Sequence, residues 1–184
     1  MATVQTRLTL DRFLKLPEQK PYLEFLDGVV TQKRSGDATQ GCLQVVIATW
    51  LGEACRATGA ARVFIELHSH WPGRASLCPD VSVYRVERIP TTPDGYIAED
   101  FWTPPDLAVE IAAPDELSWE LTSRALTLID LDVKTVMLVE PRQERIRLAR
   151  PGQETVSFTG DDVVTVEDVL PGFSFVVRDL FAAL

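Results

Sequence analysis

The sequence has little positive charge. Its 184 residues include 18 lysines and arginines against 27 aspartates and glutamates, giving a formal net charge of −9 at pH 7. Only four residues are lysines, Lys15, Lys20, Lys33 and Lys134, and they form no basic run. A protein that holds DNA by its phosphates usually presents a basic face. Contact with nucleic acid would therefore have to come from a local cluster of cations, and tight unaided binding is not expected.

Cysteine is also scarce. The three cysteines, Cys42, Cys55 and Cys78, have no C-x-x-C spacing. An odd number of cysteines at wide spacing indicates reduced thiols in the core of a cytosolic protein. The same pattern argues against a disulfide framework and against a cysteine-based zinc site.

Motifs for other kinds of catalysis are missing. His68 and His70 lie two apart on an expected strand and share a face with Glu66. A zinc site needs three or four ligands, so histidines at the edge of the core are the favoured interpretation. Ser76 and Ser82 have no partnered histidine in the sequence, and no G-x-S-x-G, G-x-G-x-x-G or Walker A motif occurs. Serine hydrolysis and nucleotide binding are therefore not indicated.

Long apolar runs are missing too. No apolar stretch approaches the roughly 20 residues that span a bilayer. The first 16 residues lack the basic-then-apolar pattern of a signal peptide. With 46% apolar and 24% charged residues, the composition is that of an ordinary globular protein. We therefore expect one domain over residues 1–184, in the cytoplasm and with no membrane partner.

The apolar pattern predicts a mixture of helices and strands. In the first half we expect a short helix over 9–14, a hairpin over 22–32 with Asp27-Gly28 at its turn, and an amphipathic helix over 40–57 that stops near Gly59. Strands are expected over 62–70 and 79–86, followed by a surface loop over 88–105.

The second half continues the alternation. We expect a buried strand over 107–112, a helix over 117–131, a buried strand over 134–140, short strands over 145–175, and an amphipathic end over 177–184. The order helix, three strands, helix, strand predicts an α/β fold with helices on the faces of a mixed sheet.

Two acids stand out by their position. Asp80 follows Pro79 at the start of an expected strand, and Glu110 lies inside the apolar run 107–112. A buried carboxylate is costly unless it is paired or bound to a metal. Carboxylate and carbonyl oxygens suit Mg²⁺ or Mn²⁺. The pattern leaves two interpretations open, a metal site or a structural ion pair of Glu110 with Arg124 or Arg62.

Several short motifs together resemble a known family. They are Glu24 followed by Phe25-Leu26-Asp27-Gly28, the helix after Gln40, Pro79-Asp80-Val81-Ser82-Val83, Val109-Glu110-Ile111 followed by Pro114, and Val133-Lys134-Thr135-Val136 leading to Leu138-Val139-Glu140-Pro141. In this order and spacing the chain resembles the Uma-type restriction endonuclease family, a branch of the PD-(D/E)xK nucleases. The resemblance implies a restriction-endonuclease-like mixed β-sheet core (αβββαβ) flanked by helices, with added N- and C-terminal β-strands.

The same resemblance implies a site and a chemistry. Asp80 and Glu110, with the backbone carbonyl of Ile111, would bind Mg²⁺ or Mn²⁺, and Glu24 would be an additional acid nearby. The metal would polarise a phosphodiester and lower the pKa of an attacking water. DNA would be the substrate, and a homodimer is implied because cutting two strands needs two sites.

The chain departs from the family pattern at two places. Ala112 stands where the signature lysine would follow the second acid, and the alternative position on the next helix is Arg124. Arginine keeps the charge that could stabilise a phosphate but does not readily act as a base. Gln40 stands where the family's helix usually opens with a histidine.

These departures leave three functional hypotheses. The first is a Mg²⁺-dependent DNA endonuclease with Asp80, Glu110, Arg124 and Glu24 as site residues. The second is a catalytically degenerate member that serves as a binding or assembly module. The third is metal-dependent hydrolysis of another phosphate ester, because the acids dictate the metal and not the substrate.

Overall fold

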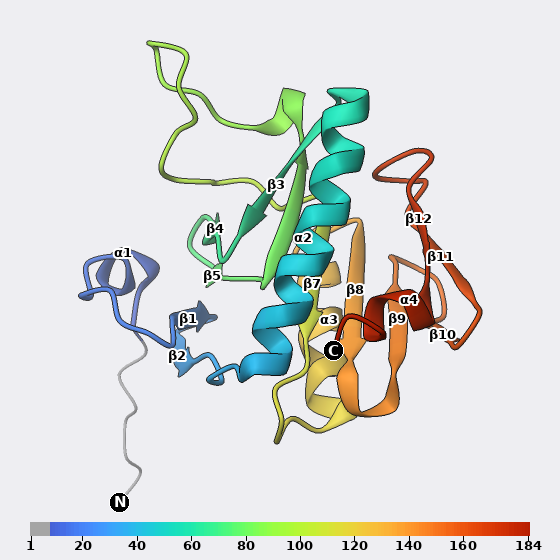
Figure 1. Ribbon diagram of the computed structural model, residues 1–184. Helices are drawn as coiled ribbons and strands as arrows, with labels where there is room; N and C mark the ends of the chain where they lie inside the picture. The colour runs from blue at the N-terminus through green and yellow to red at the C-terminus, as the bar shows by residue number, and fades with distance from the viewer. Residues whose placement is uncertain (1–7) are drawn as a thin grey trace, which may run out of the picture.

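The computed structural model describes residues 8–184, and Figure 1 gives its arrangement. The helices are α1 (Leu10–Phe13), α2 (Ala38–Thr58), α3 (Ser118–Asp130) and α4 (Val177–Phe181), with 3₁₀ turns at Val86–Arg88 and Pro141–Gln143. The strands are β1 (Leu23–Leu26), β2 (Val29–Gln32), β3 (Ala61–Ile65), β4 (Ser69–Trp71), β5 (Ala75–Leu77), β6 (Val81–Arg85), β7 (Leu107–Ile111), β8 (Thr135–Glu140), β9 (Arg145–Ala149), β10 (Val156–Thr159), β11 (Val163–Thr165) and β12 (Ser174–Val176).

A six-stranded mixed sheet forms the centre, in the order β10-β9-β8-β7-β6-β3. The β7–β8 pair is parallel, and the other neighbours are antiparallel. The parallel pair needs a crossover, which α3 supplies. This arrangement confirms the expected order of helix, three strands, helix and strand, and with it the mixed α/β fold.

The two faces of the sheet are covered by different helices. Because side chains alternate along a strand, Val109 of β7 and Met137 of β8 pack in the cluster that includes α2 and α4. Ala108 and Leu138 point the other way, into the cluster that contains the buried side of α3. Glu110, the next residue of β7 after Val109, is thereby directed to the α3 side. Figure 1 shows α2 along one face of the sheet.

Local chemistry explains where α2 begins and ends. The Asp37 carboxylate accepts the backbone N–H of Gln40 at 2.9 Å, as an N-terminal cap should. At the other end Gly59 has φ of 68°, the left-handed conformation that favours glycine. The predicted start at 40 and stop near Gly59 are therefore confirmed to within two residues.

A smaller sheet is attached at the N-terminal side, in the order β2-β1-β5-β4. Its β1–β2 hairpin turns at Asp27 and Gly28, both at positive φ, as expected for a two-residue turn. Because β1 pairs with β5, the hairpin is fixed beside the chain segment that leads into β6. The antiparallel β11–β12 pair supplies the C-terminal addition.

The prediction of one strand over 62–70 was wrong. β3 ends at Ile65, Glu66 has φ of 49°, and the chain then joins the smaller sheet as β4. β5, which follows the turn at Pro72-Gly73, was missed because it has only three residues. Three-residue strands carry too little alternation to be recognised from periodicity.

The cysteine prediction was partly wrong. All three thiols are free, but only Cys55 and Cys78 are buried, whereas Cys42 is exposed. Cys42 lies on α2 but outside the group of buried residues on that helix. Its helical position therefore turns it toward solvent.

None of the helices in 8–184 has both the length and the hydropathy to cross a bilayer. The predicted absence of a signal peptide concerns the first 16 residues, of which residues 1–7 lie outside this range.

Candidate active site

Asp80 is held in place by several hydrogen bonds. It lies one residue before β6 and is only 2% exposed. Its Oδ2 accepts the backbone N–H of Ile111 at 2.7 Å, and its own N–H donates to Val109 O at 3.1 Å. Asp80 is therefore bonded to the residues on both sides of Glu110.

Glu110 is buried in β7 and paired with a cation from the covering helix. Its Oε2 lies 2.9 Å from Arg124 Nη1, while Arg124 Nη2 lies 2.9 Å from Glu116 Oε1. Burial raises the pKa of Glu110 to about 7, although Arg124 and Lys33 lower it and Asp80 raises it further. The open choice between Arg124 and Arg62 is resolved, because Arg62 bonds to the carbonyl of Ala61.

Lys33 reaches this site, a contact that was not predicted from the sequence. It directly follows β2, and its Nζ donates to Asp80 Oδ1 at 2.6 Å and to Cys78 O at 2.7 Å. Its side chain is 9% exposed. Burial lowers the pKa of Lys33, but the charges of Glu110 and Asp80 outweigh burial and hold it above its usual range. Lys33 is therefore a buried ammonium ion.

Glu24, the additional acid that the resemblance implied, lies next to the segment that leads to Asp80. This buried residue of β1 accepts the backbone N–H of Cys78 through Oε1 at 2.9 Å. Lys33 and Glu24 thus hydrogen-bond to the backbone carbonyl and the backbone N–H of Cys78, which lies two positions before Asp80. The N-terminal hairpin supplies both side chains.

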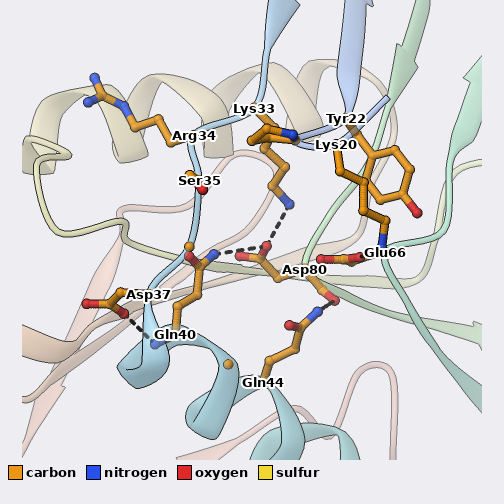
Figure 2. Close-up of a pocket in the computed structure, with 13 residues that line it drawn as sticks. Lys20, Tyr22, Lys33, Arg34, Ser35, Asp37, Gln40, Gln44, Glu66 and Asp80 are labelled. Atoms are coloured by element: carbon orange, nitrogen blue, oxygen red, sulfur yellow. Dashed lines mark hydrogen bonds and ion pairs between the residues drawn. The ribbon is translucent and has the colours of Figure 1, made fainter. Parts of the chain in front are cut away.

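A pocket of about 380 Å³ opens beside Asp80 (Figure 2). Its charged lining residues are Lys20, Lys33, Arg34, Asp37, Glu66 and Asp80. Three cations balance three acids there, in a chain whose formal net charge is −9. The pocket is thus more favourable to an anion than the chain as a whole. Of the four predicted side chains, Asp80 lines it, while Glu24, Glu110 and Arg124 are not among its lining residues.

Two glutamines of α2 complete the surroundings of Asp80. Gln40 donates through Nε2 to Asp80 Oδ1 at 3.2 Å and to Ile111 O at 3.4 Å. Gln44, one turn later, donates to the backbone carbonyl of Asp80 at 2.8 Å. The position expected for a family histidine therefore contacts two of the groups expected to bind a metal. Figure 2 shows both glutamines directed toward Asp80.

The two histidines share one neighbouring hydroxyl group. The Nδ1 atoms of His68 and His70 lie 3.2 and 3.0 Å from Ser76 Oγ, so the expectation that Ser76 lacks a histidine partner was wrong. The turn between β4 and β5 brings these residues together. Within 8–184, no group of three or more His, Cys, Asp and Glu side chains is arranged to hold a metal. The zinc site is therefore not found among the described residues.

Comparison with known proteins identifies the family. The family model Uma2, described as a putative restriction endonuclease, matches residues 10–179. The chain belongs to the Uma2 family. No curated protein matches it.

A solved structure agrees with this assignment. The Uma2-family chain is similar to a crystal structure described as a putative nuclease belonging to DUF820 from Anabaena variabilis. The TM-score is 0.90 and the sequence identity is 30%, over 96% of this chain and 98% of that one. The predicted family and fold are confirmed.

The charges of the Uma2-family site are compatible with a divalent cation. Glu24, Asp80, Glu110 and Glu116 have buried side chains, and Lys33 and Arg124 are the cations bonded among them. If all are ionised, two negative charges remain. Gln40 Oε1 is a buried oxygen without a hydrogen-bond partner in the described chain. Oxygen donors and an excess of two negative charges fit Mg²⁺ or Mn²⁺, which bind few protein groups and keep several waters.

Proposed function

We propose that this protein is a Mg²⁺- or Mn²⁺-dependent endonuclease that hydrolyses DNA phosphodiester bonds. The observation that carries the proposal is the position of Asp80, a buried carboxylate that lines a pocket together with three cations. Asp80, Glu110 and the carbonyl of Ile111 would hold the metal ion. Once bound, the ion would supply the Lewis acid that polarises the phosphodiester.

Hydrolysis forms a bond between a water oxygen and phosphorus and breaks the bond from phosphorus to the leaving sugar oxygen. A proton leaves the water, and the leaving oxygen takes one up. The chain contributes fixed charge to this reaction, since the carboxylates and Lys33 are held in place by hydrogen bonds. Arg124 supports Glu110 from α3 and, through that pair, positions the second acid.

The proposal extends to the substrate, the cellular location and the oligomeric state of the protein. DNA is the substrate class that the family's description favours. A homodimer in the cytoplasm would bring two sites to the two strands of a DNA duplex. The three cations of the pocket limit the number of phosphate contacts that each site can make.

A plasmid-cleavage assay tests the proposal. We expect nicking that requires Mg²⁺ or Mn²⁺ and stops in EDTA. Asp80→Asn and Glu110→Gln should each lower the rate by about 100-fold or more, since each removes a charge that holds the ion. These isosteric variants are preferable to alanine, because alanine would leave Lys33 or Arg124 buried without a partner.

Two controls make the assay decisive. Circular dichroism must show that both variants remain folded. Cleavage that survives in both folded variants would come from a contaminating enzyme, and no cleavage with either metal would contradict the proposal.

A catalytically degenerate binding module is the second candidate. The observation that favours it is the pairing of both principal acids with cations of the chain itself, Asp80 with Lys33 and Glu110 with Arg124. Such pairs neutralise part of the charge that would attract a metal. The same assay separates the two functions, because a module would bind without cutting.

A further inference from the structure

Two positions, 112 and 124, were expected to place a cation beside the acids, and neither offers one to a substrate. Ala112 has no charge, and both outer nitrogens of Arg124 are engaged, one with Glu110 and one with Glu116. Arg124 is also not among the residues that line the pocket beside Asp80. A phosphate group in that pocket would therefore meet a different cation.

Lys33 is the cation that both touches Asp80 and lines the pocket. An ammonium group has three N–H donors. Two of them are used, on Asp80 Oδ1 and on Cys78 O, and the third has no acceptor among the described residues. That donor is free for a phosphate oxygen.

The fold holds Lys33 in this position from two sides. Its backbone N–H donates to Tyr22 O at 2.8 Å, which continues the β1–β2 ladder by one residue. The hairpin pairs with β5, and β5 leads directly to Cys78, whose carbonyl accepts from Nζ. Figure 2 shows the Lys33 side chain extending toward Asp80. The amine is therefore preorganised before a substrate arrives.

We propose that Lys33 is the catalytic lysine of this chain and replaces the lysine missing at position 112. Its third N–H donates to a nonbridging oxygen of the scissile phosphate, where negative charge grows as water adds to phosphorus. No bond to Lys33 forms or breaks. This inference rests on the proposed nuclease function.

A purely structural role for Lys33 predicts a different result. If the ammonium ion serves only as a counter-ion that takes the metal's place, its removal frees Asp80, tightens metal binding and leaves kcat at saturating metal undiminished. If Lys33 acts on the phosphate, its removal lowers kcat even when metal saturates the site. Metal affinity and kcat, measured together, therefore distinguish the two roles.

The experiment compares Lys33→Met with Lys15→Met in the full-length protein. Both variants remove one lysine charge, but Lys15 is exposed and is not among the residues that line the pocket. We expect Lys33→Met to lower kcat for plasmid cleavage at saturating Mn²⁺ by about 100-fold or more, with KM within about threefold. Lys15→Met should keep kcat within about threefold. Mn²⁺ titration by calorimetry gives the affinity of each variant and the concentration that saturates it.

The outcomes separate this inference from the function on which it rests. Wild-type kcat in Lys33→Met, or an equal loss in the two variants, overturns the role of Lys33 and leaves the nuclease standing. An increase in Mn²⁺ affinity of about tenfold or more in Lys33→Met, together with an undiminished kcat at saturating metal, shows a counter-ion and also overturns it. An inactive wild-type protein removes the nuclease function and the role of Lys33 together.

Discussion

At the scale of single residues, several buried acids in the described part of the chain pair with cations. Asp80 has Lys33, Glu110 has Arg124, and Glu140 has Arg145 and Arg147 at 2.7 and 2.8 Å. A buried ion that loses its partner destabilises a protein strongly, even where the intact pair adds little. Substitutions at these positions must therefore be judged by stability as well as by activity.

Asp106 offers a pH-dependent test of this principle away from the site. Burial raises its pKa, but hydrogen bonds from the backbone N–H of Arg85 and from Lys134 and Arg88 lower the pKa overall, to below its ordinary value of 3.8. A lowered pKa in the folded state stabilises the protein above the unfolded-state pKa, and this contribution is lost as pH falls through the folded-state pKa.

We therefore expect Asp106→Asn to lose roughly 3 kcal/mol of unfolding free energy at pH 7, because Arg88 and Lys134 lose their common partner. The difference from wild type should shrink as the pH falls below 3.8. Urea denaturation across this range measures it. Asp161→Asn is the matched control, since Asp161 is 78% exposed in its pair with Arg178 and should change little. A pH-independent difference would contradict the assignment.

At the scale of elements, α2 directs Gln40 and Gln44 onto Asp80. Two glycines, one inside this helix and one at its end, affect its stability in opposite ways. Gly52 lies inside the helix, and an added Cβ would meet nothing within 4 Å. Gly59 ends the helix at φ of 68°, where a side chain is strained.

The same substitution should therefore have opposite effects at the two positions. Gly52→Ala should raise the unfolding free energy by about 0.5–1 kcal/mol, and Gly59→Ala should lower it by about 1–2 kcal/mol. Urea midpoints of the two variants measure the effects. Destabilisation by both would mean that α2 packs against something at Gly52.

The order of these elements could be predicted because its signals are local. The apolar spacing of α2 and α3 and the buried runs of β7 and β8 are visible within short windows. The unusual positions of Asp80 and Glu110 are visible in the same way.

Lys33 could not be predicted, because its partnership depends on a contact between distant segments. It meets Asp80 across 47 positions of sequence, through the pairing of the hairpin with β5. β5 itself has three residues and was missed. The engagement of Arg124 with Glu116 also depends on tertiary geometry, since the sequence does not reveal which acid an arginine will reach.

At the scale of the whole molecule, the proposed dimer is a separate prediction. One chain has a mass of 20.5 kDa, so light scattering after gel filtration should report twice that value. We expect a dimer because two sites are needed to cut both strands of a duplex. A mass of 20.5 kDa at micromolar concentration would contradict the dimer and would favour nicking of single strands.

The distribution of the site along the chain affects how the protein is made. Glu24 and Lys33 come from the N-terminal hairpin, Asp80 and Glu110 from the central sheet, and Arg124 from the helix that connects two parallel strands. A ribosome must therefore synthesise most of the chain before these groups can meet. Truncated translation products that end before α3 lack part of the site, so the proposed nuclease activity would arise only after α3 has been made.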